Sequence, residues 1–206
     1  SVMCYIVVFI MIQFGISLVA LYLDDSIKHP ASASPTALSL SSAVASIVII
    51  GLFLWRKWSP ISRHYLQQHP WGVLVWTILA ALGAILPLQW IYEQLNITVA
   101  DNVKQLFDSI LGSRWGYLAL GILAPVAEEL VFRGAILRCL LAYFNNRLPW
   151  IPIVVSALLF GAVHANLAQF VNASTMGLLL GWLYYRTHSV VPGVIFHWAN
   201  NTVAYA

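Results

Sequence analysis

The sequence predicts an all-α fold, a polytopic integral membrane helix bundle, and three observations lead to this fold class. Hydrophobic residues make up 61% of the 206 residues, whereas charged residues make up only 8%. A soluble domain carries about 25% charged residues. The mean hydropathy of +0.82 is correspondingly high, and several apolar runs reach the roughly 20 residues that a helix needs to cross a bilayer.

Seven apolar runs are predicted to be transmembrane helices. They are Val2 to Leu23, Leu38 to Trp55, Trp71 to Tyr92, Trp115 to Phe144, Trp150 to Ala165, Ala173 to Tyr185 and Val190 to Ala206. The first run is long for the apolar region of a cleavable signal sequence and lacks a basic leader, so we interpret it as a retained span. An eighth helix beyond Ala206 is an open alternative.

An interfacial amphipathic helix is predicted between the third and fourth spans, over Asn96 to Ser113. The spacing of its apolar residues places them on one face, as in helices that lie along the membrane surface. These residues are Val99, Val103, Leu106, Phe107, Ile110 and Leu111. We expect this helix to roof a cavity.

The loop charges predict the orientation and argue against one class of partner. Most basic loop residues gather on one side of the predicted bundle, namely Arg56, Lys57, Arg63, Arg147 and Arg186. Because basic loops stay inside the cell, the N-terminus is predicted to be intracellular. The net charge is +3, and no basic run is dense enough to follow a phosphate backbone, so no nucleic-acid partner is expected.

Three charged residues interrupt the fourth span: Glu128, Glu129 and Arg133. Charges at membrane depth persist mainly where they pair, line a wet cavity or take part in chemistry. Glu129 and Arg133 are four residues apart and share a helix face, so we expect an ion pair, whereas Glu128 is turned about 100° away from Glu129. Pro125 is expected to kink this helix and to ease hydration of the carboxylates. Glu128 is therefore the candidate reactive carboxylate.

Later spans add His164, His197 and Asn201 as candidate partners. The helical rise places Glu128 and His164 roughly 25 and 21 Å from the same membrane side. It places His197 and Asn201 roughly 16 and 22 Å from that side. A carboxylate beside an imidazole can deprotonate a water molecule, and an imidazole and an amide on one helix face supply donors for an oxyanion. The candidate residues therefore cover both requirements of amide hydrolysis, an activated water molecule and hydrogen-bond donors for the oxyanion.

Three motifs stand in order along the last spans and resemble those of a known family. They are Glu128-Glu129-x-x-x-Arg133, Phe160-x-x-x-His164 and His197-x-x-x-Asn201. The combination is similar to the CPBP family, which includes CAAX-processing type II proteases of the Rce1 kind, bacteriocin-processing and immunity proteins, and abortive-infection (Abi) proteins. The resemblance extends from Trp115 to Ala206.

The resemblance implies an intramembrane endopeptidase of the glutamate type. The catalytic residues that it implies are Glu128, His164, His197 and Asn201. Glu128 and His164 would activate water, while the other two would stabilise the oxyanion. Glu129 with Arg133 would give structural support. The substrate would be a membrane-associated protein or peptide, and no cofactor is expected.

The sequence has no internal repeat and no low-complexity tract, which favours a single domain. Residues 1–206 are predicted to form a single membrane domain, with three N-terminal spans in residues 1–92 and a CPBP-like catalytic core in residues 115–206. The expected location is the inner or plasma membrane of a bacterial cell, with the lipid bilayer as its surroundings. Prenylated CAAX tails are the substrate of the eukaryotic branch of this family, and nothing in this sequence selects them.

Other interpretations use the same residues. Two Glu and two His residues could bind Zn²⁺, but the His-Glu-x-x-His pattern of zinc helices is absent from the sequence, so a metal-free site is favoured over a metalloprotease. A non-enzymatic immunity factor or scaffold would use the polar residues to hold its helices together. A transporter is favoured least, because the sequence shows neither paired broken helices nor an internal repeat.

Overall fold

A computed structural model describes most of the chain, namely residues 2–29, 32–60, 63–95, 101–113, 115–145, 147–164, 166–203 and 205. Every regular element within these ranges is helical, which confirms the predicted all-α class. The helices, in chain order, are α1 (Val2–Leu23), α2 (Pro35–Trp55), α3 (Arg63–Gln67), α4 (Trp71–Gln94), α5 (Asp101–Leu111), η2 (Tyr117–Leu123), α6 (Ala124–Glu129), η3 (Leu130–Leu137), α7 (Arg138–Tyr143), α8 (Trp150–Ala162), α9 (Leu167–Thr187) and α10 (Val191–Val203).

Three of these helices, α1, α2 and α4, are long and apolar enough to cross a membrane, with 22, 21 and 24 residues. Helix α8 is also apolar but has only 13 residues, and α10 has 13 residues. At about 1.5 Å per residue, 13 residues extend roughly 20 Å, which is less than the hydrocarbon core. The structure therefore supports a polytopic membrane bundle, and the count of seven spans stays a prediction.

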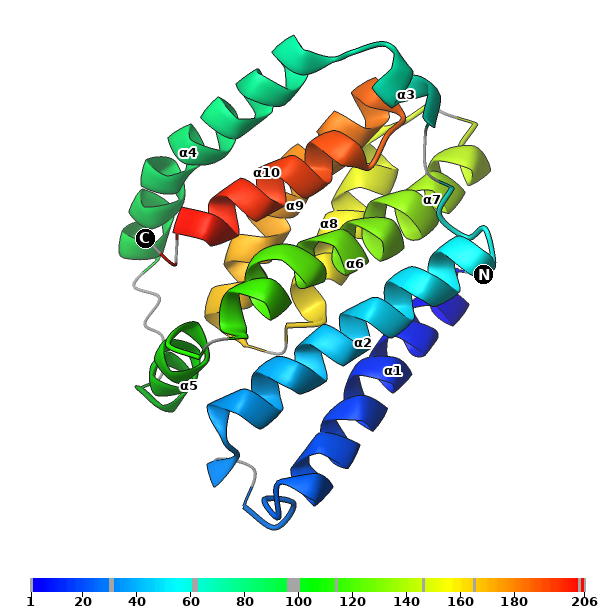
Figure 1. Cartoon of the computed structure of the whole chain (residues 1–206). Coiled ribbons are helices and arrows are strands. Elements are labelled where there is room, and N and C mark those ends of the chain that lie inside the picture. The colour runs from blue at the N-terminus through cyan, green and yellow to red at the C-terminus, as the bar shows by residue number, and fades with distance from the viewer. Residues whose placement is uncertain are drawn as a thin grey trace.

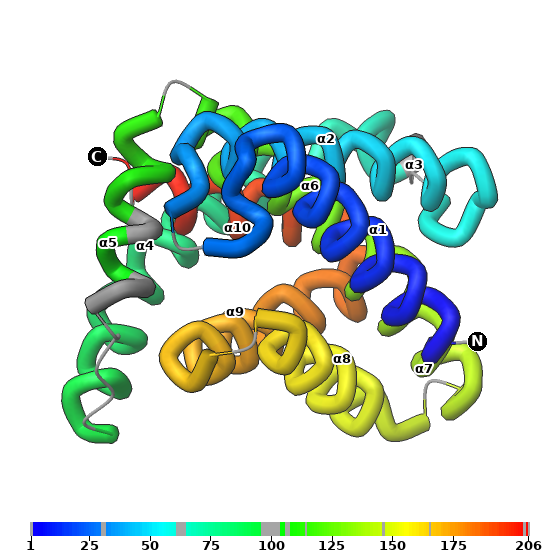
Figure 2. Tube along the Cα trace, turned by 90° about the horizontal axis from the view of Figure 1, so that it is seen from below, coloured from blue at the N-terminus to red at the C-terminus, as the bar shows by residue number. Residues whose placement is uncertain are grey.

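Helix α6 lies at the centre of the bundle. It contacts α2 on one side and α10 on the other, and α1 pairs with α2 on the side away from α10 (Figure 1). Helices α8 and α9 pack against each other and form a separate layer beside α6 and α10 (Figure 2). Helix α6 therefore lies between two groups of helices, α9 and α10 on one side and α1 and α2 on the other.

Residues 117–143 form one continuous helical rod in which the hydrogen-bond register changes along the chain. Two π-helical segments, η2 and η3, flank the short α-helix α6. Pro125 lies at the start of α6 and has no N–H to donate. The disruption predicted at Pro125 thus appears as a π-helical register beside it, an arrangement that is frequent at functional sites.

Aromatic rings join the two layers. The Phe132 ring lies 5.6 Å from the Phe9 ring and 5.1 Å from the Phe160 ring, measured between centroids. Phe132 and Phe160 are fully buried. Where α8 and α9 meet, a Cβ added to Gly177 would lie 2.9 Å from the Cα of Ala157, so this close approach requires glycine.

Two predicted boundaries are wrong. Helix α8 ends at Ala162, so His164 lies in the turn after the helix rather than inside it. Helix α9 begins at Leu167 rather than near Ala173. The first turns of α9 carry carboxamides, which lower the hydropathy of this segment. The hydropathy pattern therefore predicts a start of the span that is too late.

The predicted interfacial helix corresponds to α5, an amphipathic helix. Residues 96–100, which include Val99, lie outside the described residues, and so do the side chains of Val103, Leu106 and Phe107. The side chains of Arg63 and Arg114 are not described either. Ile110 of α5 lines the cavity that holds Glu128, at the place where we expected a roof.

Candidate active site

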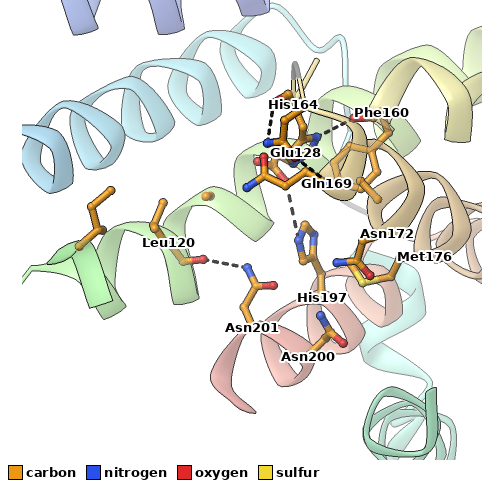
Figure 3. A pocket seen from close by; sticks show the side chains of 14 residues that line it. Leu120, Glu128, Phe160, His164, Gln169, Asn172, Met176, His197, Asn200 and Asn201 are labelled. Carbon is orange, nitrogen blue, oxygen red and sulfur yellow. Dashed lines mark hydrogen bonds and ion pairs between the residues drawn. The ribbon is translucent and has the colours of Figure 1, made fainter. Parts of the chain in front are cut away.

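A cavity of about 510 Å³ lies between α6, α9 and α10. Its lining brings together Glu128 from α6, His164 from the turn after α8, and His197 with Asn201 from α10 (Figure 3). The other lining residues are Ile110, Leu120, Ala124, Phe160, Asn166, Gln169, Asn172, Ala173, Met176 and Asn200. All four residues for which a catalytic role was predicted from the sequence thus face one cavity.

The adjacent glutamates occupy different environments. The Glu129 side chain is fully buried, and its Oε1 accepts a 2.7 Å hydrogen bond from Nη1 of Arg133. The Glu128 side chain is 15% exposed and lines the cavity. This difference follows from helix geometry, because consecutive residues point about 100° apart. Glu128 is the carboxylate that a substrate or water molecule in the cavity would meet.

Arg133 is fully buried and has contacts on several sides. In addition to Glu129, its Nη2 donates a 3.3 Å hydrogen bond to the Gly177 carbonyl. Its guanidinium carbon lies 4.5 Å from the centroid of the Phe160 ring, a cation–π arrangement. A buried charge needs such compensation, because an unpaired one is strongly destabilising. Arg133 therefore ties the rod to α8 and α9 directly behind the cavity.

His197 lies between the two carboxylates. Its Nε2 is 3.7 Å from Oε2 of Glu128, and its Nδ1 is 3.5 Å from Oε1 of Glu129. Both distances exceed those of a good direct hydrogen bond. The imidazole therefore lies near both carboxylates but forms a direct hydrogen bond with neither. One turn earlier on α10, a Cβ added to Gly193 would lie 2.5 Å from Oε2 of Glu129. The absence of a side chain at Gly193 lets α10 approach this closely.

The His164 side chain has a defined tautomer. Its Nδ1 lies 2.8 Å from the main-chain oxygen of Phe160, one of the last carbonyls of α8. A carbonyl can only accept, so Nδ1 must carry the hydrogen and donate it. In the neutral imidazole, Nε2 is then the free acceptor. The same bond satisfies a helix-terminal carbonyl, which explains how a residue in a turn keeps a fixed position.

Asn201 uses one of its amide hydrogens within the protein. Its Nδ2 donates a 2.9 Å hydrogen bond to the main-chain carbonyl of Leu120 (Figure 3). In the π-helical register, the N–H of Ala124 bonds to the carbonyl of Ala119, five residues earlier. The next such donor would be Pro125, which has no N–H. Asn201 thus supplies the hydrogen that Leu120 lacks, and its second amide hydrogen is left for other partners.

Several carboxamides that the sequence analysis did not select also line the cavity. Asn166, Gln169 and Asn172 come from the start of α9, and Asn200 comes from α10. Asn166 Oδ1 also caps α9 by accepting a 2.8 Å hydrogen bond from the Gln169 N–H. The sequence signal for these residues is the run of carboxamides after His164, namely Asn166, Gln169 and Asn172, which starts at the N-cap of α9.

The zinc alternative can be compared with the geometry of the described side chains. Within the part of the chain that the structure describes, no group of three or more His, Cys, Asp or Glu side chains is arranged to hold a metal ion. Structural and catalytic zinc sites use at least three protein ligands.

Comparison with known proteins gives a family for the part of the chain that carries this cavity. Residues 110–203 match the family model described as type II CAAX prenyl endopeptidase Rce1-like. This segment resembles the Rce1-like family. The match includes all the residues that line the cavity, from Ile110 to Asn201. The resemblance expected from the three sequence motifs is therefore confirmed, whereas the bacteriocin-immunity and Abi branches receive no specific support.

Two curated bacterial proteins are also similar to this chain. UPF0177 protein YbdI of Lactococcus lactis subsp. lactis (strain IL1403) is 26% identical over 130 residues, which are 63% of this chain and 68% of the relative. The protein named "Putative membrane peptidase YdiL" of Bacillus subtilis (strain 168) is 27% identical over 103 residues, which are 50% of this chain and 41% of the relative. No solved structure matches the chain significantly. Together the matches support an intramembrane protease.

Proposed function

We propose that the protein is an intramembrane endopeptidase that hydrolyses a peptide bond of a membrane-associated protein or peptide. The observation that carries this proposal is the placement of Glu128. It is a partly exposed carboxylate on the wall of a cavity that also holds His164, His197 and Asn201. The Rce1-like match over residues 110–203 supports the same class of reaction.

In the proposed reaction, Glu128 and His164 together activate a water molecule. Glu128 takes one proton from the water, and Nε2 of His164 accepts a hydrogen bond from it, which orients the oxygen toward the scissile carbonyl. A bond forms between the water oxygen and the carbonyl carbon. The proton on Glu128 then passes to the leaving nitrogen as the carbon–nitrogen bond breaks, so the products are a carboxylic acid and an amine.

The tetrahedral intermediate carries a negative oxygen that needs hydrogen-bond donors. His197 and the second amide hydrogen of Asn201 line the cavity and are the proposed donors. Removal of one such donor typically lowers kcat by about 10²–10³-fold. Among the described lining residues there is no Ser or Cys, which favours a direct attack by water over an acyl-enzyme.

The cavity lining also bears on the substrate. Apart from Glu128, its described lining residues carry no acidic or permanently cationic side chain, and most of its polar groups are carboxamides. Carboxamides both donate and accept hydrogen bonds, so they match the main chain of a peptide rather than a charged group. We propose the plasma membrane of a bacterial cell as the location, because both curated relatives come from bacteria.

A proteomic comparison tests the proposal. Cells with wild-type protein are compared with cells carrying Glu128→Gln, and uncut membrane peptides are expected to accumulate in the variant. The matched control is Glu93→Gln, which neutralises an exposed glutamate outside the cavity and should accumulate none. If Glu128→Gln folds, reaches the membrane and leaves every peptide unchanged, the endopeptidase proposal is wrong and a scaffold role takes its place.

The proposed reaction uses no metal, and a separate measurement tests this. Purified protein is analysed for bound metal, and cleavage is measured before and after strong chelation. We expect substoichiometric metal and unchanged cleavage. Stoichiometric zinc together with chelator-sensitive cleavage would instead establish the metalloprotease.

A further inference from the structure

A second cavity, of about 420 Å³, adjoins the first on the other side of α6. The two cavities share four lining residues: Leu120, Ala124, Glu128 and His164. The remaining walls of the second cavity come mainly from α1 and α2, which lie across α6 from α10 (Figure 1). Glu128 and His164 thus stand at the boundary between two cavities, and a bound chain could extend from this pair in two directions.

The far wall of the second cavity carries polar side chains inside apolar helices. Gln13 and Ser17 are four residues apart on α1, so they share one helix face, and Ser42 comes from α2. Gln13 is the sole carboxamide of α1, and α1 has no charged residue. An amide at this position is not needed for packing against lipid, because an apolar side chain would be preferred there.

These polar groups are not used inside the protein. Among the described residues, the hydroxyls of Ser39, Ser41 and Thr77 bond to carbonyls of their own helix. Within the same described part, the side chains of Gln13, Ser17 and Ser42 make no hydrogen bond. A polar group without a hydrogen-bond partner in an apolar environment is unfavourable. A ligand with hydrogen-bonding groups would supply the missing partners.

We propose that the cavity lined by Gln13, Ser17 and Ser42 is a second substrate subsite, in which the Gln13 carboxamide binds the main chain of the peptide beside the scissile bond. This rests on the proposed endopeptidase function. The peptide passes Glu128 and His164, with one flank in the carboxamide-lined cavity of α9 and α10 and the other flank against α1. A carboxamide can donate to a peptide carbonyl and accept from a peptide N–H at once, so Gln13 suits an extended main chain of any sequence.

In this arrangement Gln13 is a positioning residue, and its loss should weaken binding rather than chemistry. Two neutral hydrogen bonds correspond to about a tenfold change in affinity. Gln13→Leu is therefore expected to raise KM about tenfold while kcat stays within about twofold. Gln13→Asn should recover part of the loss. Because Leu suits a membrane helix better than Gln, the unfolding temperature of Gln13→Leu should be equal to or above that of the wild type.

The test begins with membrane peptides that accumulate in Glu128→Gln cells, and a synthetic peptide spanning one identified cleavage site is the probe for purified variants. Met11→Leu is the matched control, because Met11 is exposed on the same helix and lines neither cavity. The subsite is supported if Gln13→Leu raises KM, Gln13→Asn recovers it and Met11→Leu changes nothing.

Two other outcomes separate the two proposals. If peptides depend on Glu128 but the KM of Gln13→Leu equals that of the wild type, the subsite proposal is wrong and the endopeptidase proposal stands. If no peptide depends on Glu128, both proposals fail. A loss of kcat in Gln13→Leu together with a lower unfolding temperature would assign Gln13 a structural role and would also overturn the subsite.

Discussion

The side-chain amide of Asn201 donates a 2.9 Å hydrogen bond to the main-chain carbonyl of Leu120. The donor comes from α10 and the acceptor from the π-helical segment η2, so the bond joins two elements that flank the cavity. Leu120 is left without its π-register donor because that donor would be Pro125. Asn201 thus bonds to a carbonyl that Pro125, which precedes the glutamate pair, cannot serve because it has no N–H.

A double-mutant cycle tests this link between Asn201 and Pro125. Asn201→Ala should lower the free energy of unfolding by about 1–3 kcal/mol, because the Leu120 carbonyl loses its partner. In the Pro125→Ala background the new N–H can bond to Leu120, so the same substitution should be less destabilising by about 1 kcal/mol. Asn200→Ala is the control and should change stability little. Equal effects of Asn201→Ala in both backgrounds would contradict the explanation.

The buried ion pair between Glu129 and Arg133 predicts an asymmetric response to substitution. Arg133→Met leaves a buried carboxylate without its partner and should destabilise the protein by about 3–5 kcal/mol. Adding Glu129→Gln removes the stranded charge, so the double variant should be more stable than Arg133→Met alone. Arg138→Met, at an exposed arginine, is the control. Chemical unfolding in detergent measures all four proteins, and a double variant less stable than Arg133→Met would refute the prediction.

Gly193 sets the distance between α10 and the buried carboxylate. Gly193→Ala would place a methyl group 2.5 Å from Oε2 of Glu129, so either the carboxylate or α10 must move. Because His197 is one turn further along α10, peptide cleavage should fall by at least tenfold, in line with the sensitivity of catalysis to shifts of about 1 Å. Gly51→Ala meets no atom within 4 Å and should keep wild-type cleavage. Equal activity of both variants would show that the site tolerates the shift.

The sequence was sufficient for the fold class and for four residues of the cavity, Glu128, His164, His197 and Asn201. The charged motif around Glu128 stands out because charge is rare at membrane depth, and the four-residue spacings of Glu129 with Arg133 and of His197 with Asn201 directly encode shared helix faces. These relationships are local, so they depend only on helix geometry and not on how distant helices pack.

Features that depend on tertiary structure were not predictable in this way. Hydropathy placed the start of α9 too late, since Gln169 and Asn172 are polar because they face a cavity and not because they lie in a loop. The position of His164 beyond the end of α8 was missed for a similar reason, as its apolar neighbours continue the pattern of the helix. The approach of Gln13 to the Glu128 site brings together residues more than a hundred positions apart, and no local pattern encodes it.

A pH dependence is expected in the loop between α1 and α2. The hydroxyl of Ser26 and the main-chain N–H and hydroxyl of Ser34 donate hydrogen bonds to Asp24 at 2.7, 2.8 and 2.7 Å. These bonds hold the pKa of Asp24 below its ordinary value of 3.8. Because the folded pKa is the lower one, the stabilisation is fully present above the unfolded pKa and is lost as the pH falls through the folded pKa.

Asp24→Asn should therefore be less stable than the wild type at neutral pH, and the difference should shrink below about pH 4. Unfolding curves at several pH values measure the difference. Asp25→Asn is the control, because Asp25 makes no such side-chain bonds among the described residues and its φ of 55° is tolerated by Asn. A constant difference between pH 7 and pH 3 for Asp24→Asn would contradict the assignment.

The two nitrogens of His164 should be separable by substitution. An Asn side chain can place its amide donor near the position of Nδ1, so His164→Asn is expected to keep the bond to the Phe160 carbonyl and to preserve stability within about 1 kcal/mol. It has no counterpart of Nε2 and should lower the cleavage rate by about 10²–10⁴-fold, the usual contribution of general acid–base catalysis. His164→Gln places its polar group near Nε2 and gives up the helix-terminal bond, so it should lose stability as well as activity. Cleavage and unfolding are measured on the same purified samples. Wild-type cleavage by His164→Asn would remove His164 from the proposed water-activating pair and leave that task to Glu128 alone.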